Sequence, residues 1–504
     1  MSRTLDRIEG EVKPILHSEI RAKPKLSSHF VTVISALLLA TVTTLTSPTP
    51  LPQAPAPGAA PAPAGHLERA LVAATTAEGA TRHLAALQRI ADGAGGSRAA
   101  GTPGHERSAR YAGRLLEAAG YDVTYQRFDF DHREPVAERL TQLTPRERAL
   151  PIRLMTYTAS TPEGGVEAPL ADAGDGCESG DFPEGAFRGR IALIERGECT
   201  FARKAANAAA AGAVGAVVRN NVPGALSGTL DADSPAGIPV GGIGQEDGAE
   251  LHQALADGSE VRVRLELRER SERRTTTNVL ADSPGGDPSR TVLVGAHLDS
   301  VPEGPGINDN GSGAAGVLET ALRLAAVDPA GRHGNRVRFA LWSAEEEGLL
   351  GSKHYVAGLS AAERSDVALY LNFDMIGSPN HGIFVYAADP DADPARSAAV
   401  SEDLTAFLRA RGDSPAPARF DGRSDYAPFL AAGIPAGGAY TGAEGIKTEA
   451  QAEAWGGTPG APFDPCYHAA CDDHGNIGAE ALEAGVKLIA HAVGSYAERL
   501  PAAH

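Results

Sequence analysis

The chain has 504 residues, of which 42% are hydrophobic, and its formal net charge is −18 at pH 7. At roughly 150 residues per domain, this length predicts about two or three globular domains with a sizeable buried core. The acidic balance argues against nucleic acid and anionic membrane surfaces as partners, because both require clustered Lys and Arg.

The N-terminal segment has the pattern of an export signal. Basic residues Arg21, Lys23 and Lys25 precede an apolar run over residues 30–45. This order is typical of a secretory signal peptide, and the run is short for a membrane span of about 20 residues. We therefore expect a signal peptide with a long n-region over residues 1–46, and a secreted protein without a stable membrane partner. An uncleaved anchor is the alternative.

The composition after the signal also indicates an extracellular protein. Residues 47–65 are rich in Pro and Ala and predict an extended linker that cannot pack. The chain has four cysteines, an even number that suits two disulfides in an oxidising compartment. Proximity in the sequence favours the pairs Cys177–Cys199 and Cys466–Cys471, although other connectivities are possible.

Residues 66–145 predict the first part of an α/β domain. Apolar residues recur at helical spacing over residues 66–91. Residues 105–130 predict a helix, a break at Gly120 and then a strand. A helix followed closely by a strand is the expected opening of an α/β domain.

Residues 146–270 differ in texture from the segments on either side. They contain short apolar strands, many glycines, an Ala-rich helical pattern over residues 200–213 and a strand pattern over residues 214–221. This strand–helix–strand order indicates an inserted module. The α/β pattern resumes afterwards, so we expect the first domain to continue over residues 271–504.

The second part of this domain predicts a βαβαβ unit. Strand patterns at residues 291–296, 337–342 and 367–373 alternate with helical patterns at residues 313–326 and 348–359. This order implies parallel strands with right-handed crossovers. We therefore predict an α/β fold with a largely parallel sheet flanked by helices, and a ligand site beyond the carboxyl ends of its strands.

Ionisable residues follow all three predicted strands or lie in the loop between them. They are His297, Asp299, Asp309, Glu345, Glu346 and Asp374. Carboxylates that meet at one sheet edge cannot all stay ionised without cations, and mixed nitrogen and oxygen ligands suit Zn²⁺. A lone loop histidine would carry no such meaning. A second imidazole is still needed, and His468 is the best candidate, in a loop bounded by Cys466 and Cys471.

Five motifs, in order and spacing, carry a resemblance to a known family. They are GAHLDSV with GINDNGSG (295–313), WSAEEEGLLGS (342–352), YLNFDMIGSPN (370–380), DGRSDYAPF (421–429) and CYHAACD (466–472). Together they resemble the secreted bacterial leucyl aminopeptidases, di-zinc exopeptidases that include aminopeptidase S and aminopeptidase Y. The stretches at residues 189–221 and 237–244 are similar to the protease-associated domain. The resemblance implies a zinc exopeptidase fold, with a mixed, largely parallel sheet and an inserted protease-associated domain.

The resemblance also implies two Zn²⁺ per chain and assigns their ligands. It places His297 and Asp374 on one zinc, Glu346 and His468 on the other, and Asp309 between them as the bridging carboxylate. Some relatives also bind calcium near the C-terminus. Calcium remains possible here but is not supported, because the acidic residues that hold it are not clearly matched around Glu483 and Lys487.

The acidic triplet Glu345–Glu347 leaves its register open on composition alone. The family pattern is two acids, one variable residue and a glycine, and Gly348 fixes this register. It implies that Glu345 is the general base and Glu346 a zinc ligand. Glu347 is then expected to be a solvated acid at a helix start.

Other residues take roles by the same resemblance. Asp299 is expected to orient the imidazole of His297, and Tyr467 to donate its hydroxyl to the oxyanion. The substrate pocket is expected to be formed by Met375, Gly422, Arg423 and Tyr440. The resemblance implies an aminopeptidase that acts on peptide or protein N-termini, and such a mostly apolar pocket implies a preference for large hydrophobic residues such as Leu. We expect the protein to be a monomer.

Two other classes of function compete with this interpretation. One is a binding or receptor-like protein that keeps the fold but has lost metal ligands, although none of the expected ligand positions is substituted. The other is a carboxypeptidase, or a glutaminyl-cyclase-like acyltransferase, which typically uses one zinc. The inserted module shows no pattern of catalytic or metal-binding residues. It could gate or restrict access of large substrates, contact protein substrates, or have a purely structural role, and we expect restricted access.

Overall fold

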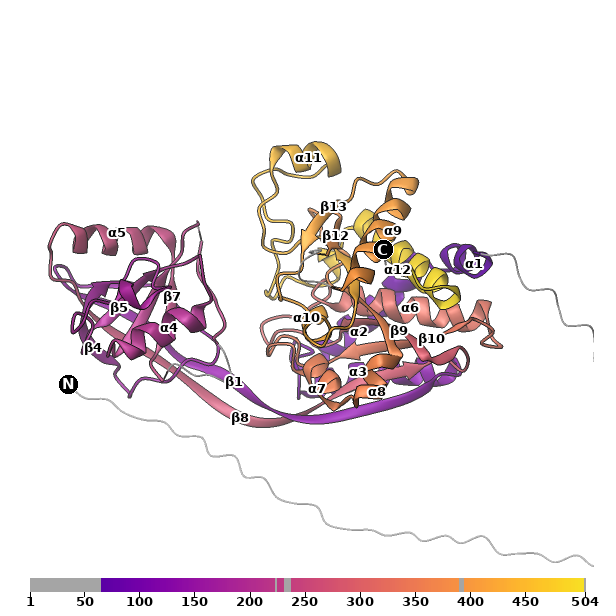
Figure 1. Cartoon of the computed structure of the whole chain (residues 1–504), viewed down its shortest axis with the longest axis horizontal. Coiled ribbons are helices and arrows are strands. Elements are labelled where there is room, and N and C mark those ends of the chain that lie inside the picture. The colour runs from indigo at the N-terminus through magenta and orange to yellow at the C-terminus, as the bar shows by residue number, and fades with distance from the viewer. Residues whose placement is uncertain (1–64, 223, 231–236, 389–393, 503–504) are drawn as a thin grey trace, which may run out of the picture. The chain divides into compact units, whose positions relative to one another are not determined.

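The computed structural model describes residues 65–222, 224–230, 237–388 and 394–502. The expected signal peptide and nearly all of the expected linker lie outside these residues. Within them, no helix has the length and apolar character needed to cross a membrane. The strands of the described residues form a 14-stranded sheet with helices packed on it (Figure 1).

The helices and strands have the following bounds. The α-helices are α1 (His66–Ala74), α2 (Ala77–Asp92), α3 (Pro103–Ala118), α4 (Phe201–Ala210), α5 (Gln245–Ala256), α6 (Gly311–Val327), α7 (Leu350–Gly358), α8 (Ala361–Asp366), α9 (Ala395–Arg411), α10 (Tyr426–Ala431), α11 (Glu449–Trp455) and α12 (Ala479–Glu498). The strands are β1 (Asp122–Thr144), β2 (Arg148–Leu150), β3 (Ile152–Leu154), β4 (Val166–Asp172), β5 (Ile191–Glu195), β6 (Gly215–Arg219), β7 (Val240–Ile243), β8 (Arg262–Asp282), β9 (Asp287–His297), β10 (Asn335–Trp342), β11 (Val367–Phe373), β12 (Phe384–Ala387), β13 (Ala416–Arg419) and β14 (Ala436–Tyr440). Short 3₁₀ helices are η1 (Ser179–Asp181) and η2 (His474–Asn476).

The predicted βαβαβ unit is confirmed, and it forms the centre of the sheet. Strand β9 pairs in parallel with β10 on one side and with β11 on the other. The order of connection therefore reverses at β9, which creates a crevice beyond its carboxyl end. The sheet is mixed, as expected, because β8 pairs antiparallel with β10 and β12 pairs antiparallel with β14.

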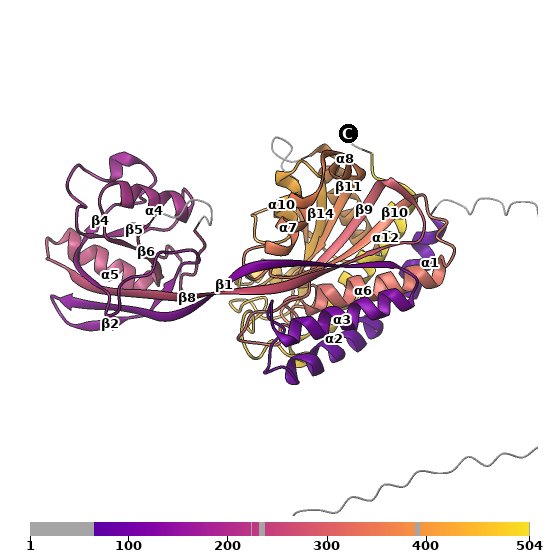
Figure 2. The same cartoon turned by 90° about the horizontal axis from the view of Figure 1, so that it is seen from below.

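The central strands are buried on both faces, which explains why they have continuous apolar sequences. On β9, Val292 and Val294 belong to one hydrophobic cluster, whereas Leu293 between them belongs to another. Side chains alternate between the faces of a strand, so both faces require apolar residues. Figure 2 shows α2, α3 and α6 on one face and α7, α8 and α10 on the other.

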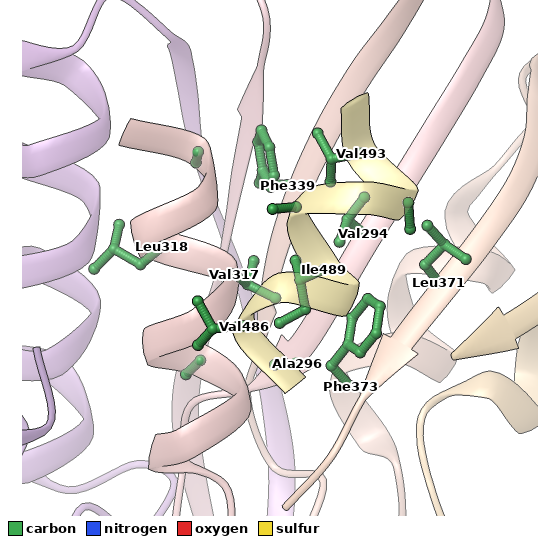
Figure 3. Packing of buried hydrophobic residues seen from close by; sticks show 14 of the residues in the cluster. Val294, Ala296, Val317, Leu318, Phe339, Leu371, Phe373, Val486, Ile489 and Val493 are labelled. Carbon is green, nitrogen blue, oxygen red and sulfur yellow. The ribbon is translucent and has the colours of Figure 1, made fainter. Parts of the chain in front are cut away.

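Helices α6 and α12 pack closely on the first of these faces (Figure 3). Val317 of α6 and Val486 and Ile489 of α12 are fully buried with the sheet residues of the same cluster. A methyl group at Gly316 would lie 2.7 Å from Ile489, so the glycine permits this close approach. The dense packing gives the ends of β9, β10 and β11 a rigid base.

The expected helical run over residues 66–91 is two helices. Thr75 has extended backbone after α1, and the side chain of Thr76 accepts a hydrogen bond from the N–H of Gly79 to begin α2. A threonine at this position stabilises a helix start. Apolar spacing alone did not show the interruption, because the hydrophobic pattern continues across it.

The inserted segment is joined to the rest of the fold by a long two-stranded ribbon, which we name the β1–β8 ribbon. Its antiparallel pairing runs from Asp122 opposite Asp282 to Thr144 opposite Arg262. Between its far ends the chain forms β2 to β7, with β4, β5, β6 and β7 paired in parallel. The Cys177–Cys199 disulfide lies in this segment.

Candidate metal and catalytic site

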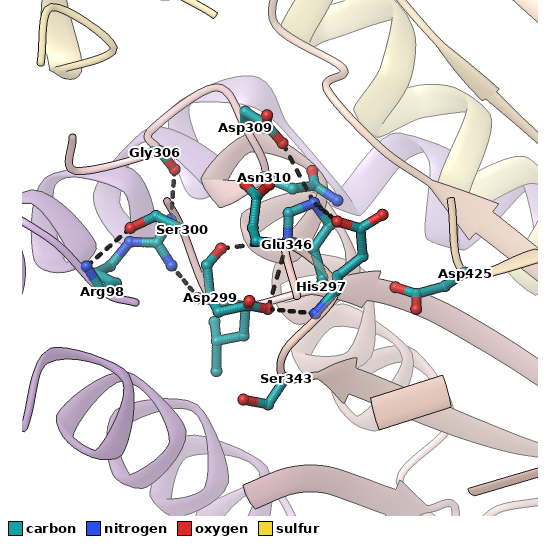
Figure 4. Close-up of polar contacts among 12 residues, drawn as sticks. Arg98, His297, Asp299, Ser300, Gly306, Asp309, Asn310, Ser343, Glu346 and Asp425 are labelled. Atoms are coloured by element: carbon teal, nitrogen blue, oxygen red, sulfur yellow. Dashed lines mark hydrogen bonds and ion pairs between the residues drawn. The ribbon is translucent and has the colours of Figure 1, made fainter. Parts of the chain in front are cut away.

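Histidine and carboxylate side chains meet at the carboxyl ends of β9, β10 and β11. The structure brings together all five residues for which the sequence predicts metal ligation, namely His297, Asp309, Glu346, Asp374 and His468. His297 ends β9, Asp309 precedes α6, and Glu346 and Asp374 follow β10 and β11. The strand ends therefore converge as the sequence predicts, and Figure 4 shows His297, Asp309 and Glu346 close together.

Their ligand atoms form two adjacent groups that share one carboxylate. In the first group, His297 Nε2 lies 3.2 Å from Asp309 Oδ1 and 3.4 Å from Asp374 Oδ1. In the second, His468 Nε2 lies 3.2 Å from Asp309 Oδ2 and 3.1 Å from Glu346 Oε2. Asp309 therefore presents one oxygen to each group, which is the geometry of a bridging ligand.

The donor set fits a pair of divalent cations. Glu346 Oε1 and Asp374 Oδ1 are buried and have no hydrogen-bond partner among the described residues. Burial raises the pKa of Glu346 to about 7, and the nearby charge of Asp309 adds to the rise. Burial alone would lower the pKa of His468, but Glu346 and Asp309 raise it to about 11. Bound cations would coordinate the buried oxygens that lack a hydrogen bond and would stabilise the ionised carboxylates. Mixed imidazole and carboxylate donors suit Zn²⁺.

Asp299 lies behind the imidazole of His297 and is fully buried. Its backbone carbonyl lies 3.2 Å from His297 Nδ1, whereas its carboxylate oxygen Oδ1 lies 3.7 Å from that nitrogen. The carbonyl therefore makes the closer contact with the ring. The same carboxylate oxygen accepts a hydrogen bond of 3.3 Å from the backbone N–H of Glu345, so Asp299 contacts both the β9 end and the loop after β10.

Glu345 and Tyr467 border the two groups. Glu345 Oε2 lies 3.9 Å from His297 Nε2, and burial raises the pKa of Glu345 well above its usual range. The ring of Tyr467 stacks on that of His468, with centroids 3.9 Å apart. Its hydroxyl oxygen accepts a hydrogen bond of 3.3 Å from Arg423, and a phenol that accepts still has its own proton to donate.

Comparison with known proteins identifies the family. Residues 278–493 match the model of peptidase family M28, and residues 166–251 match the PA domain. The probable lipoprotein aminopeptidase LpqL of Mycobacterium tuberculosis is 40% identical over 83% of this chain and 84% of the relative. The chain belongs to peptidase family M28. This M28 peptidase is therefore a peptide hydrolase with an inserted PA domain, as the motifs predicted.

Other relatives agree over similar shares of the chain. An aminopeptidase of Pseudomonas aeruginosa is 41% identical over 81% of this chain and 78% of its own length. Among solved structures, an aminopeptidase from Aneurinibacillus sp. strain AM-1 has a TM-score of 0.69 at 28% identity and covers 86% of this chain and 97% of its own. A zinc aminopeptidase from Bacillus subtilis has a TM-score of 0.62 at 30% identity, over 83% of this chain and 95% of its own.

Two buried residues of the M28 peptidase hold the ligand loops, and sequence reasoning gave neither of them a role. The first is Arg98, whose fully buried guanidinium donates to the carbonyls of Leu298, Pro305 and Gly306. Its backbone N–H also donates to Ser300 Oγ at 2.9 Å. Burial lowers the pKa of Arg98 to about 10, so it remains charged at neutral pH. It supports the loop between His297 and Asp309. The sequence could not reveal this role, because Arg98 lies about 200 residues before the loop and belongs to no motif.

The second is Asp472, which joins the two loops that carry Asp309 and His468. Its carboxylate accepts hydrogen bonds from the backbone N–H groups of Asn308 at 2.8 Å and Asp309 at 2.9 Å. Its carbonyl accepts a third from Ile307 at 2.9 Å. The Cys466–Cys471 disulfide ends directly before it and closes the His468 loop, so both proposed cysteine pairs are confirmed. The motif CYHAACD contained Asp472, but its contacts were not visible in the sequence.

A cavity of about 90 Å³ opens beside these groups. Of the expected substrate-pocket residues, Met375, Arg423 and Tyr440 line it, whereas Gly422 does not. The N–H of Gly422 instead donates to the hydroxyl of Tyr426 at 3.1 Å. The further lining residues away from the ligand groups are Tyr386, Arg419, Asp421, Ser424, Tyr426 and Ala443. The cavity is therefore more polar than the sequence suggested, because charged residues border aromatic walls.

Contacts away from the ligand groups concern two other residues considered in the sequence, Glu347 and Lys487. The side chain of Glu347 is not solvated, because it is only 18% exposed and its Oε1 lies 2.6 Å from His132 Nδ1. At the position considered for calcium, the ammonium of Lys487 donates to the carbonyls of Val72 at 2.8 Å and Thr75 at 2.6 Å. Glu483 Oε1 lies 3.7 Å from the same ammonium. A side-chain cation thus already satisfies these oxygens.

Replacing Asp472 with Asn should weaken metal binding by roughly 10- to 100-fold, the usual effect of removing a group that orients a ligand. The amide can accept from only one of the two backbone N–H groups that the carboxylate now satisfies, so the Asp309 loop loses a restraint. Zinc affinity measured by competition with a chelator tests this. Asp473→Asn is the matched control, because Asp473 is exposed and caps Gly475 instead. Equal zinc affinity in both variants would contradict the role given to Asp472.

Proposed function

We propose that this M28 peptidase is a zinc-dependent aminopeptidase that binds two Zn²⁺ per chain. The observation that carries the proposal is the shared carboxylate of Asp309, with one oxygen toward the His297 group and the other toward the His468 group. Relatives named aminopeptidases and the structure titled a zinc aminopeptidase from Bacillus subtilis support it. Zinc bound by these residues would lower the pKa of a water toward roughly 7 and polarise the scissile carbonyl.

In this mechanism Glu345 is the general base. Its buried carboxylate lies beside the ligand groups. It belongs to neither of the two groups that share Asp309, which are His297 with Asp374 and Glu346 with His468. It would take a proton from the attacking water and transfer it to the leaving amine. Tyr467 would donate its hydroxyl hydrogen to the oxygen that develops negative charge, while Arg423 holds that hydroxyl from the other side.

The charges around the cavity favour recognition of the substrate's amino end. The carboxylates of Glu345 and Asp374 line it and suit an α-ammonium group. Arg423 is neutralised by Glu444, to which it donates at 2.9 and 3.2 Å. Arg419, the other lining cation, is exposed. A buried, unpaired cation that would select a terminal carboxylate is therefore absent from the described lining residues, which argues against a carboxypeptidase.

The same proposal includes the organisation and location of the chain. We place the peptidase domain at residues 66–145 and 271–504 and the protease-associated domain at residues 146–270, supported by the β1–β8 ribbon and the PA-domain match. Residues 1–46 act as the export signal. Two disulfides and a lipoprotein relative support a protein that acts outside the cytoplasm. The proposal takes the protein to be a monomer.

Removing the metal should abolish hydrolysis of Leu-p-nitroanilide, and added Zn²⁺ should restore it. Atomic absorption of the purified protein should find about two zinc ions per chain, because two donor groups share Asp309. One zinc would favour a cyclase-like acyltransferase, and none would favour a non-catalytic binding protein. Activity that persists after chelation would overturn the zinc mechanism.

The Glu345→Gln variant should keep both zinc ions and lose roughly 10²–10⁴-fold in kcat, the usual contribution of a general base. The amide retains the size of the side chain but cannot take a proton. Steady-state kinetics and zinc content, measured on the same preparation, test the assignment. Loss of zinc in this variant would instead make Glu345 a ligand.

The N-terminal residue should be selected by its charge and by its free amine. We expect Leu-p-nitroanilide to be hydrolysed faster than Glu-p-nitroanilide, because the acidic site repels a second carboxylate. A change of one methylene is worth only about 1–3 kcal/mol, so preference among apolar residues should be graded. N-acetyl-Leu-p-nitroanilide should be inert, because acetylation removes the ammonium that pairs with buried carboxylates. Equal turnover of the acetylated substrate would exclude an aminopeptidase.

A further inference from the structure

The loop that carries Glu345 and Glu346 has an unusual backbone. We name residues 343–349 the acid loop. Ala344 and Leu349 both have left-handed backbone, with φ values of 56° and 62°. The N–H groups of Gly348 and Leu349 both donate to the carbonyl of Glu345 at 2.8 Å. Left-handed non-glycine residues persist only where the surroundings impose them, so the contacts that hold this loop determine where the carboxylate of Glu345 lies.

On its inner side the acid loop is held by the peptidase domain. The backbone N–H of Glu345 donates to Asp299 at 3.3 Å, and the N–H of Ser343 donates to Asn278 at 2.9 Å. Leu350, at the start of α7, donates to the carbonyl of Ala344 at 2.8 Å. These contacts fix both ends of the loop and leave its turn at Glu347 to be held from outside.

Glu347 is held by two residues that lie outside the α/β core. His132 of the β1–β8 ribbon, only 7% exposed, has its Nδ1 2.6 Å from Glu347 Oε1. Tyr157, which follows β3 in the inserted segment, donates its hydroxyl to the backbone carbonyl of Glu347 at 3.1 Å. A methyl group at Gly348 would lie 3.4 Å from that hydroxyl, so Tyr157 packs closely on the turn. One contact holds the side chain and the other holds the backbone.

Both holding residues are themselves fixed by the ribbon. The guanidinium of Arg133 lies 5.2 Å from the ring centroid of Tyr157 and forms an ion pair with Glu269 of β8. The ring of His132 meets that of Phe130 edge-on, with centroids 6.5 Å apart. The ribbon therefore connects the inserted segment with the acid loop through side chains that are packed or paired at each step.

We propose that Tyr157 of the inserted protease-associated domain and His132 of the β1–β8 ribbon that carries this domain are positioning residues for catalysis, so that the inserted domain and its ribbon help to set the geometry of the general base. This inference rests on the role proposed for Glu345. It gives the inserted domain a role in catalysis that is separate from any restriction of substrate access. Neither residue touches the substrate cavity, so both act through Glu347 on the acid loop.

A positioning role has a distinct kinetic signature. A small displacement of Glu345 lowers the rate of proton transfer, and misplacement by about 1 Å can cost roughly 100-fold. Binding of a small substrate depends on the cavity lining, which neither residue contacts. We therefore expect kcat to fall while KM stays nearly constant. A domain that only limits access would change KM for large peptides and leave small substrates unaffected.

The first experiment compares Tyr157→Phe with Tyr111→Phe in the full-length protein, using Leu-p-nitroanilide. Tyr111 is the control, because its hydroxyl is also hydrogen-bonded, at 2.8 Å from His83 Nδ1, and both residues lie far from the acid loop in the sequence. We expect Tyr157→Phe to lower kcat by about 10-fold, with KM within twofold and zinc content unchanged. Tyr111→Phe should keep the wild-type kcat. A wild-type kcat in Tyr157→Phe, or an equal fall in both variants, would overturn the proposal.

The second experiment tests rescue at His132. Leu removes the contact with Glu347, whereas Asn retains a donor near the place of Nδ1. We expect His132→Leu to lower kcat by about 10-fold and His132→Asn to recover most of it, at equal melting temperature and zinc content. Equal kcat in the two variants would contradict a role through Glu347. Failure of the general-base assignment is recognised separately, because Glu345→Gln would then retain activity.

Discussion

The repulsion among buried carboxylates is the constraint on which the site depends. Asp309 lies within contact distance of both imidazoles, Asp374 lies close to His297 and Glu346 lies close to His468. Burial and the nearby charge of Asp309 raise the pKa of Glu346 to about 7. Two added divalent cations would replace this repulsion with attraction between the cations and the carboxylates. The donor set by itself therefore indicates a metal site. The scaffold must hold these groups together both before and after such cations bind.

The scaffold does this by supporting short loops from behind. The strands that end at the site are buried on both faces, so their ends cannot move without disturbing two hydrophobic clusters. Arg98 then fixes the loop after β9, and Asp472 fixes the backbone at Asp309 to the disulfide-closed loop of His468. A buried arginine would repel cations bound nearby. The guanidinium of Arg98, however, directs its hydrogen bonds to backbone carbonyls and lies on the far side of Asp299 from His297.

What could be predicted from the sequence follows from the range of the interactions. The βαβαβ order and the ligands at strand ends could be predicted because periodicity is local and parallel strands share one carboxyl edge. The cysteine pairs were also close in the sequence. Arg98, Asp472 and His132 could not be found in this way, since each acts on backbone or side chains 160 or more residues away. The break between α1 and α2 was missed for the opposite reason, because a single cap at Thr76 overrides a continuous apolar pattern.

The β1–β8 ribbon explains how an inserted domain can influence a site that it does not line. An insertion at a surface loop is joined to its host by two flexible connections and transmits little. Here the two connections are paired strands, and the pairing continues from the edge of the peptidase sheet into the inserted segment. The ribbon has a register shift between Pro135 and Ala137, close to His132 and Arg133, which contact the acid loop and Tyr157. Because β-bulges re-aim the side chains beside them, this irregularity lies where the direction of the ribbon's side chains matters most for the loop that carries Glu345.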